Sequence, residues 1–278
     1  MKKLLCSIFA VLVLLSAGSM AFAAEPTRFD GKVYNMTGDL WVVEEVPVVL
    51  TSGQGNSTVR LISLKPEGSD LNERFWLEVR PPADAPYPTP YIVELPRGIR
   101  GYNPRLEVSK FVVGERQHGF LVLETVPGGP RQFAVLELQG QRLVVLFDSM
   151  VVARAILSGN YIGQYKVMLH VYDTGTDAIL DVSPRKSYYQ SKGVYNSRGD
   201  ILETVSVSAY RYRDVSIGQR DADGVSQLNA VIDLYGYDGS DHIAIINCTM
   251  RYDSNFGFWK LTKSEFVPDS DIGFWTKR

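Results

Sequence analysis

Short runs in which apolar and polar residues alternate recur along the chain, and beyond residue 24 no long segment repeats apolar residues at helical spacing. Residues 166–172 alternate in this way, a Thr-Gly-Thr turn follows, and residues 178–182 resume the alternation. This pattern predicts a β-hairpin, because successive side chains of a strand point to opposite faces. Residues 133–147 repeat the pattern around a Gln-Gly-Gln turn and predict a second hairpin.

Within the second hairpin, residues 143–147 are apolar throughout, so we expect this strand to be buried on both faces. Further strands are expected at 41–50, 59–64, 75–79, 106–113, 120–126, 204–213, 228–235, 243–252 and 258–263. Many short strands separated by turn residues predict an all-β protein, built as a sandwich, a barrel or a propeller.

One stretch breaks this pattern. Residues 81–90 contain five prolines and Pro96 follows, so the segment lacks backbone donors that a strand needs. We expect a loop or a hinge over residues 81–96. The chain then divides into an N-terminal β unit, residues 24–100, and a better-patterned β domain, residues 101–278. The alternative is a long surface loop inside one domain.

The first residues have the three parts of a secretory signal peptide. Lys2 and Lys3 carry charge, residues 4–15 are apolar, and the small residues that follow end in Ala21-Phe22-Ala23. A membrane anchor is the alternative, but the apolar run is short against the about 20 residues that span a bilayer. We expect cleavage of residues 1–23, export to the periplasm or the extracellular space, and no transmembrane segment in the mature chain.

Cleavage changes both the charge and the cysteine count. The chain has 278 residues, a net charge of −2 and two cysteines; without residues 1–23 it has 255 residues, a charge of −4 and only Cys248. One cysteine forms no intrachain disulfide, so we expect stability to come from core burial. A mildly acidic chain without a cluster of Lys and Arg lacks the positive surface that nucleic-acid binding requires.

The order of elements between residues 105 and 265 follows a known pattern. Strand 106–113, turn 114–119 and the hairpin after it make one unit, residues 194–200 form a polar turn, and residues 212–228 lead into two closing strands. In this order the chain resembles the β-propeller-type repeats called FG-GAP or VCBS repeats, found in many exported bacterial proteins. The resemblance implies antiparallel sheets arranged like propeller blades, though too few for a large ring. A β-sandwich is the alternative.

The resemblance also implies a calcium loop. In the family, Asp or Asn occupies alternate positions before a Gly, and an acidic residue follows three positions after it. Asp221, Asp223 and Gly224 match this pattern, whereas Gln219 and Gln227 depart from it. Because amides replace two carboxylates, we expect a weak Ca²⁺ site at Asp221 and Asp223, or an empty one. The alternative is a tight turn in which Asp side chains accept hydrogen bonds from backbone donors.

One short motif points to catalysis. Asp173-Thr174-Gly175 is the triplet of aspartic proteases, in which two aspartates share a proton. The sequence has no second triplet of this kind, so a retropepsin-like protease requires a homodimer. The alternative is a hairpin turn, which Asp and Gly commonly form. The sequence has no zinc-ligand motif, nucleophile elbow or phosphate-binding loop.

Tyrosines gather in the C-terminal third of the chain. Tyr210 and Tyr212 alternate on one strand, and Tyr237 follows the next. On a common solvent face these rings form a stacking platform for sugar rings or for a protein partner; the alternative is packing inside the sheet. Cys248 alternates with apolar residues on its strand, so we expect an inert buried thiol.

The sequence therefore favours an exported, non-catalytic β-rich protein that binds a ligand or a partner, or that has a structural role in the cell envelope. It has many loops between strands, where such scaffolds carry their binding surfaces. The expected partner is a carbohydrate or a protein. A hydrolase acting through Asp173 is the alternative. No cofactor is expected apart from the weak Ca²⁺ site.

Overall fold

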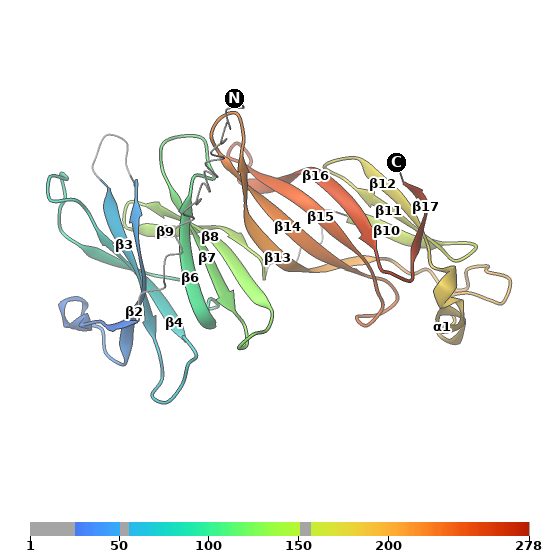
Figure 1. Ribbon diagram of the computed structural model, residues 1–278, viewed down its shortest axis with the longest axis horizontal. Coiled ribbons are helices and arrows are strands. Elements are labelled where there is room, and N and C mark those ends of the chain that lie inside the picture. The colour runs from blue at the N-terminus through green and yellow to red at the C-terminus, as the bar shows by residue number, and fades with distance from the viewer. Residues whose placement is uncertain (1–25, 51–55, 151–156, 278) are drawn as a thin grey trace, which may run out of the picture.

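The computed structural model describes residues 26–50, 56–150 and 157–277. The expected all-β fold is confirmed: the strands form four antiparallel sheets, and within the described residues none of the sheets closes into a barrel (Figure 1). The expected signal peptide lies outside the described residues. Among the residues that the structure describes, no helix is long and apolar enough to cross a membrane.

Sheet I has the strand order β1-β2-β3-β4-β5. Its elements are β1 (Thr27–Arg28), the 3-10 helix η1 (Gly31–Tyr34), β2 (Leu40–Val48), β3 (Ser57–Leu64), β4 (Arg74–Arg80) and β5 (Tyr91–Glu94). The proline-rich residues 81–90 connect β4 to β5, and these two strands pair with each other. The proline stretch therefore connects two paired strands of one sheet.

Sheet II is a meander of four strands in sequence order. It consists of β6 (Tyr102–Ser109), β7 (His118–Glu124), β8 (Arg131–Gln139) and β9 (Arg142–Asp148). The hairpin expected at 133–147 is confirmed as β8 and β9, and Gly140 in its turn has a φ of 63°, which a residue without Cβ adopts easily.

Sheets III and IV come from the rest of the chain, and the last strand of the chain belongs to sheet III. Sheet III contains β10 (Leu157–Ile162), β11 (Lys166–Val171), β12 (Thr176–Asp181) and β17 (Gly273–Lys277). Sheet IV contains β13 (Ser208–Arg220), β14 (Ser226–Tyr235), β15 (His242–Asp253) and β16 (Phe258–Pro268). Between β12 and β13 lie η2 (Ser183–Arg185) and the short helix α1 (Lys186–Ser191).

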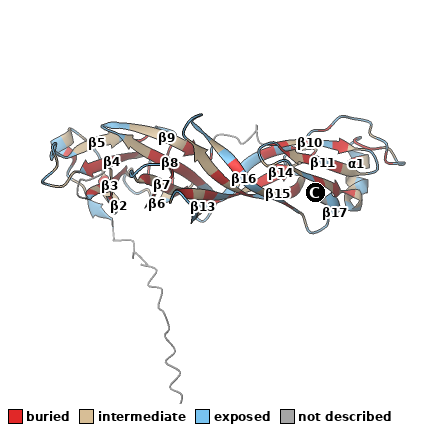
Figure 2. Ribbon diagram, turned by 90° about the horizontal axis from the view of Figure 1, so that it is seen from above, coloured by how far each residue is buried: buried red, intermediate tan, exposed pale blue. Residues whose placement is uncertain are grey.

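The sheets follow one another along the long axis in the order I, II, IV, III, as both views show (Figures 1 and 2). The chain therefore passes from sheet II to the far end, returns through sheet IV and ends beside β12 in sheet III. Because β17 pairs with β12, the end of the chain ties sheet III to sheet IV. The carboxylate of Asp173, in the β11–β12 turn, also accepts a hydrogen bond from the backbone N–H of Leu261 in β16.

Sheet II is buried on both faces, and this makes the core continuous. Leu121 and Leu136 belong to the cluster shared with sheet I, whereas Phe120 and Val135 belong to the cluster shared with sheets III and IV. Neighbouring residues of a strand point to opposite faces, so β7 and β8 each contribute to both clusters. The expected division near residue 100 falls between β5 and β6, where the core continues from sheet I to sheet II.

The strands predicted from alternation all have counterparts, but four strands lack a sequence signal. These are β1, β5, β10 and β17, which have two to six residues each. β13 also continues to Arg220, although its last seven residues are mostly polar. Its pairing with β14 explains this extension, because the ladder supplies hydrogen bonds that sequence propensity does not reveal.

Candidate functional site

An open groove lies where sheet III meets sheet IV, and we call it the tyrosine groove. Its volume is about 610 Å³. Before the chain enters β13 it pairs with β10: Tyr161 donates its backbone N–H to Val205, and Val207 donates to Gly159. The pairing of Ser208 with Tyr235 then places the start of β13 beside the loop after β14. The lining includes Ser206, Ser208, Tyr210, Tyr235, Tyr237 and Asp238.

The tyrosine rings border the groove at different depths. Tyr210 is 58% exposed, and its ring packs edge-on against Tyr235 with the centroids 5.6 Å apart. Tyr235 in turn contacts the ring of His242 at 5.2 Å. Tyr237 is half-buried, and the Nζ of Lys192 lies 5.8 Å from its ring centroid. The groove thus combines the exposed ring of Tyr210 with the rings of Tyr235 and Tyr237, which contact His242 and Lys192.

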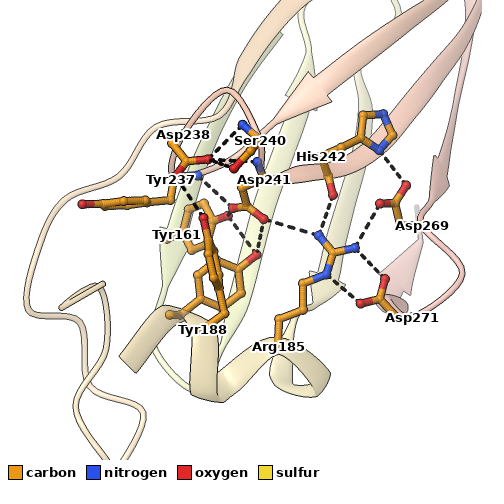
Figure 3. Close-up of polar contacts among 11 residues, drawn as sticks. Tyr161, Arg185, Tyr188, Tyr237, Asp238, Ser240, Asp241, His242, Asp269 and Asp271 are labelled. Carbon is orange, nitrogen blue, oxygen red and sulfur yellow. Dashed lines mark hydrogen bonds and ion pairs between the residues drawn. The ribbon is translucent and has the colours of Figure 1, made fainter. Parts of the chain in front are cut away.

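The loop that carries Tyr237, residues 236–241, is fixed by a buried carboxylate (Figure 3). Asp241 Oδ2 accepts hydrogen bonds from the Tyr161 hydroxyl at 2.8 Å and from the Tyr237 backbone N–H at 2.9 Å. Its Oδ1 accepts from the Tyr189 hydroxyl at 3.1 Å. The side chain of Asp241 is only 1% exposed. A buried charge is tolerated when donors surround it, and here they position the loop.

Arg185 supplies the balancing positive charge beneath the loop (Figure 3). Its Nη1 lies 3.3 Å from Asp241 Oδ1 and donates to the carbonyl of His242. Its Nη2 and Nε bind Asp271 at 2.5 and 2.7 Å, and Nη2 also reaches Asp269 at 3.0 Å. One guanidinium therefore joins η2, the start of β15 and the segment before β17.

The same contacts shift the ionisation of the groups around the loop. The hydrogen bonds from Arg185 hold the pKa of Asp271 below its usual value, and they raise the pKa of Arg185. Burial is the main cause that raises the pKa of the hydroxyls of Tyr161 and Tyr189. Burial, followed by its hydrogen bond to Asp238, raises the pKa of Tyr188 to about 12. These tyrosines are hydrogen-bond donors at neutral pH.

A second charged cluster lies beside the first on β13, β14 and β15. Asp233 is 2% exposed at its side chain, and its Oδ1 lies 2.5 Å from Arg213 Nη2 and 3.2 Å from His242 Nε2. His242 Nδ1 lies 2.7 Å from Asp269, which links the two clusters. Arg211 Nε is 3.4 Å from Asp233. The charges beside the tyrosine groove are thus paired with one another.

The structure brings two of the three expected tyrosines to the groove and separates the third. Tyr210 and Tyr237 line it. Tyr212 lies on the inner face, where its ring contacts Phe147 with the centroids 5.2 Å apart and its hydroxyl points to Met250. The expected shared face of Tyr210 and Tyr212 is therefore wrong. Irregular pairing of β13 between Ala209 and Tyr212 changes the face on which the next side chains lie.

The expected calcium loop is a turn between β13 and β14 that an arginine bridges. Asp221 Oδ1 accepts hydrogen bonds from the backbone N–H groups of Asp223 and Val225. Arg251 then lies 3.0 Å from Asp221 Oδ2 and 2.7 Å from Asp223 Oδ2. A cation between these carboxylates has to displace the guanidinium of Arg251, and within the described residues no acidic or histidine cluster has metal-binding geometry.

The remaining candidates have structural contacts. Asp173 accepts from the Leu261 backbone at 2.8 Å, and Thr174 bonds to Thr176 and Ser264. Cys248 is buried, and burial raises the pKa of its thiol to about 12. The three histidines, His118, His170 and His242, lie in sheets II, III and IV and do not meet at one site.

Sequence reasoning missed the groups that hold the loop. Arg185, Asp241 and Asp233 carry no motif, and Arg185 is 56 residues away from Asp241. One signal was available: residues 235–242 read Tyr-Gly-Tyr-Asp-Gly-Ser-Asp-His, which combines turn residues with aromatic rings and acids. Such a loop is typical of a surface that a rigid scaffold presents.

Residues 156–267 match the family model of the YybI C-terminal domain. The match spans strands β10 to β15 and most of β16, and it includes the tyrosine groove. None of the curated proteins that were compared matches the chain.

Proposed function

We propose that this chain is an exported, non-catalytic binding protein that takes a carbohydrate into the tyrosine groove. The observation that carries this proposal is the loop 236–241, which buried hydrogen bonds hold in place so that Tyr237 lines the groove together with Tyr210. Tyrosine offers a large rigid contact area at low entropic cost, and serine and glycine beside it offer adaptable hydrogen bonding. The C–H face of a sugar ring stacks on such rings while its hydroxyls reach the polar groups.

The size of the groove favours a small ligand over a protein. Its volume of about 610 Å³ lies within the range of small-molecule sites. The acids that border it are engaged: Asp238 accepts from Tyr188 and Ser240, and Asp241 lies beneath the loop. These contacts support binding in preference to a hydrolase, and the contact of Asp173 with Leu261 supports a structural role for that residue.

Export and the blade-like arrangement belong to the same proposal. The charged and apolar start of the chain, its small residues before Ala24 and the single cysteine of the remaining chain support export. Sheets II and IV are four-stranded meanders in sequence order, which supports the resemblance to FG-GAP or VCBS blades. The four sheets lie in an open row and not in a ring (Figure 1). This arrangement supports a sandwich-like stacking of neighbouring sheets.

A glycan array tests the proposed function. The full exported chain is applied to an array of cellulose-, chitin- and peptidoglycan-derived oligosaccharides, beside the variants Tyr210→Ala and Tyr172→Ala. Tyr172 is 56% exposed and lies outside the groove, so it is a matched control. We expect Tyr210→Ala to weaken binding about tenfold or more and Tyr172→Ala to leave it unchanged. Equal binding by the two variants, or no bound glycan, contradicts the proposal.

A further inference from the structure

A second groove lies on the same sheet as the tyrosine groove. Its volume is about 700 Å³, and it is open to solvent over β13, β14, β15 and β16. Most of its lining side chains point away from the hydrophobic core. We call the face of sheet IV that carries these side chains its outer face. Amides and hydroxyls predominate in the lining, which includes Ser216, Asn229, Asn247, Thr249 and Thr262. Three charged residues, Asp214, Lys263 and Glu265, also line it.

The strand register places the two grooves in line. On β14 the outer residues are Tyr235, Asp233, Val231 and Asn229; Tyr235 lines the tyrosine groove, and Val231 and Asn229 line the second. Six residues of strand span about 20 Å. The path continues across the sheet, since Asn229 pairs with Thr249 and Thr249 pairs with Lys263.

The charges between the grooves are compensated. Asp233 is bound by Arg213 at 2.5 Å, and His242 lies between Asp233 and Asp269. A neutral ligand that crosses this point leaves no charge unpaired, whereas an anion or a cation competes with an existing ion pair. At this point between the grooves, the pairing therefore favours an uncharged segment of the ligand.

We propose that the two grooves form one elongated site for a straight, uncharged, β-1,4-linked hexopyranose chain. This inference rests on the proposed function and adds the length and the linkage of the ligand. A β-1,4-linked chain extends without coiling, so it follows the line of β14. Its ring faces meet Tyr210 and Tyr237 at one end, and its hydroxyls meet Asn229, Asn247 and Thr249 at the other.

Titration calorimetry with oligosaccharides of two lengths tests the inference. The full chain is titrated with cellobiose and cellohexaose, and in a second arm with the chitin disaccharide and hexasaccharide. A disaccharide reaches only the tyrosine groove, whereas a hexasaccharide reaches both grooves. We expect the hexasaccharide of one series to bind about tenfold or more tightly than its disaccharide, because a second set of hydrogen bonds forms. The two arms show whether the ligand needs N-acetyl groups.

Variants in the second groove separate this inference from the proposed function. Asn247 is exposed on the sheet surface, so Asn247→Trp blocks the second groove and Asn247→Ala removes its amide. We expect both variants to lower the hexasaccharide affinity towards that of the disaccharide, with Asn247→Ala the milder, and to leave the disaccharide affinity unchanged. Thr276→Trp, at an exposed position of β17, is the control of equal bulk.

The outcomes are distinguishable. Equal affinity for both lengths, or a length advantage that Asn247→Trp and Asn247→Ala leave intact, overturns the elongated site while the tyrosine groove stands. Failure of both lengths in both series to bind overturns the β-1,4-linked ligand, and the glycan array then decides the proposed function separately. Preservation of the near-ultraviolet circular dichroism shows that each variant is folded.

Discussion

At the scale of single residues, Asp241 holds the tyrosine groove together. Its two carboxylate oxygens accept four hydrogen bonds from protein donors, one of them from Arg185, which also provides the opposite charge. Removal of one partner from a buried charged group leaves the others without compensation, so its cost exceeds that of an exposed ion pair. The position of Tyr237 therefore depends on a residue whose side chain is almost wholly buried.

The variant Asp241→Ala measures this dependence. We expect it to lower the free energy of unfolding by about 3–5 kcal/mol, because two buried tyrosine hydroxyls lose Asp241 as an acceptor and Arg185 loses one of its paired carboxylates. Asp177→Ala is the control, since Asp177 forms an ion pair with His170 and is 58% exposed at its side chain; its cost is expected to stay below about 1 kcal/mol. Urea unfolding measures both. Equal costs contradict the role assigned to Asp241.

The buried tyrosines predict an alkaline limit to stability. The folded protein raises the pKa of Tyr161 and Tyr189, and that of Tyr188 to about 12. A raised pKa contributes stability that is complete below the unfolded value of about 10 and is lost as the pH rises through the folded value. We expect the urea midpoint to fall above about pH 10, and to fall less steeply in Tyr161→Phe. An identical pH dependence of this variant and the parent protein contradicts the prediction.

At the scale of elements, the loop 236–241 requires a glycine at its start. A Cβ on Gly236 overlaps the hydroxyl of Tyr161 and Oδ2 of Asp241, so only glycine lets these groups approach the backbone. Gly236 also donates its N–H to the carbonyl of Asp241, which closes the loop. The hydrogen bonds of Asp241 and the backbone conformation at Gly236 therefore depend on each other.

Replacement of this glycine has a matched control in the same loop. We expect Gly236→Ala to displace Tyr161 or Asp241, to lower the melting temperature by several degrees and to weaken ligand binding. A Cβ on Gly239 meets no atom within 4 Å, so Gly239→Ala is expected to change the melting temperature little. Differential scanning calorimetry compares the two. An unchanged melting temperature in Gly236→Ala contradicts the requirement for glycine at this position.

Strands were easier to predict than the faces of their side chains. Alternation located the hairpin β11–β12 and the hairpin β8–β9, since period two is a local property. It failed at Tyr212, because the irregular pairing of β13 depends on β14 and leaves no mark in the sequence of β13. Tyr210 is exposed, whereas Tyr212, which follows the irregularity that begins at Ala209, lies on the inner face.

At the scale of the whole molecule, the site arises from segments that are distant in sequence. The tyrosine groove joins Ser206 and Tyr210 to Tyr237, and the network beneath it adds Tyr161 and Arg185. Sequence reasoning found the tyrosines because aromatic residues cluster locally. It could not find Arg185, whose partners Asp241, Asp269 and Asp271 meet it only after β17 returns to sheet III.

The spatial order of the sheets was also hidden from the sequence. Sheet IV follows sheet III along the chain but lies between sheets II and III in space (Figure 1). Contacts such as that between Trp259 and the carbonyl of Leu146 fix this order. These contacts join residues more than one hundred positions apart, and periodicity carries no information at that range.

Locating a bound oligosaccharide on the protein tests most directly whether the tyrosine groove binds a carbohydrate. The full chain, with isotope-labelled tyrosine rings, is titrated with the tightest-binding oligosaccharide of the array and followed by nuclear magnetic resonance. We expect the signals of Tyr210, Tyr235 and Tyr237 to shift with ligand concentration, while that of the exposed Tyr172 on the β11–β12 turn stays in place. Shifts at Tyr172 without shifts at Tyr210 and Tyr237 contradict this expectation.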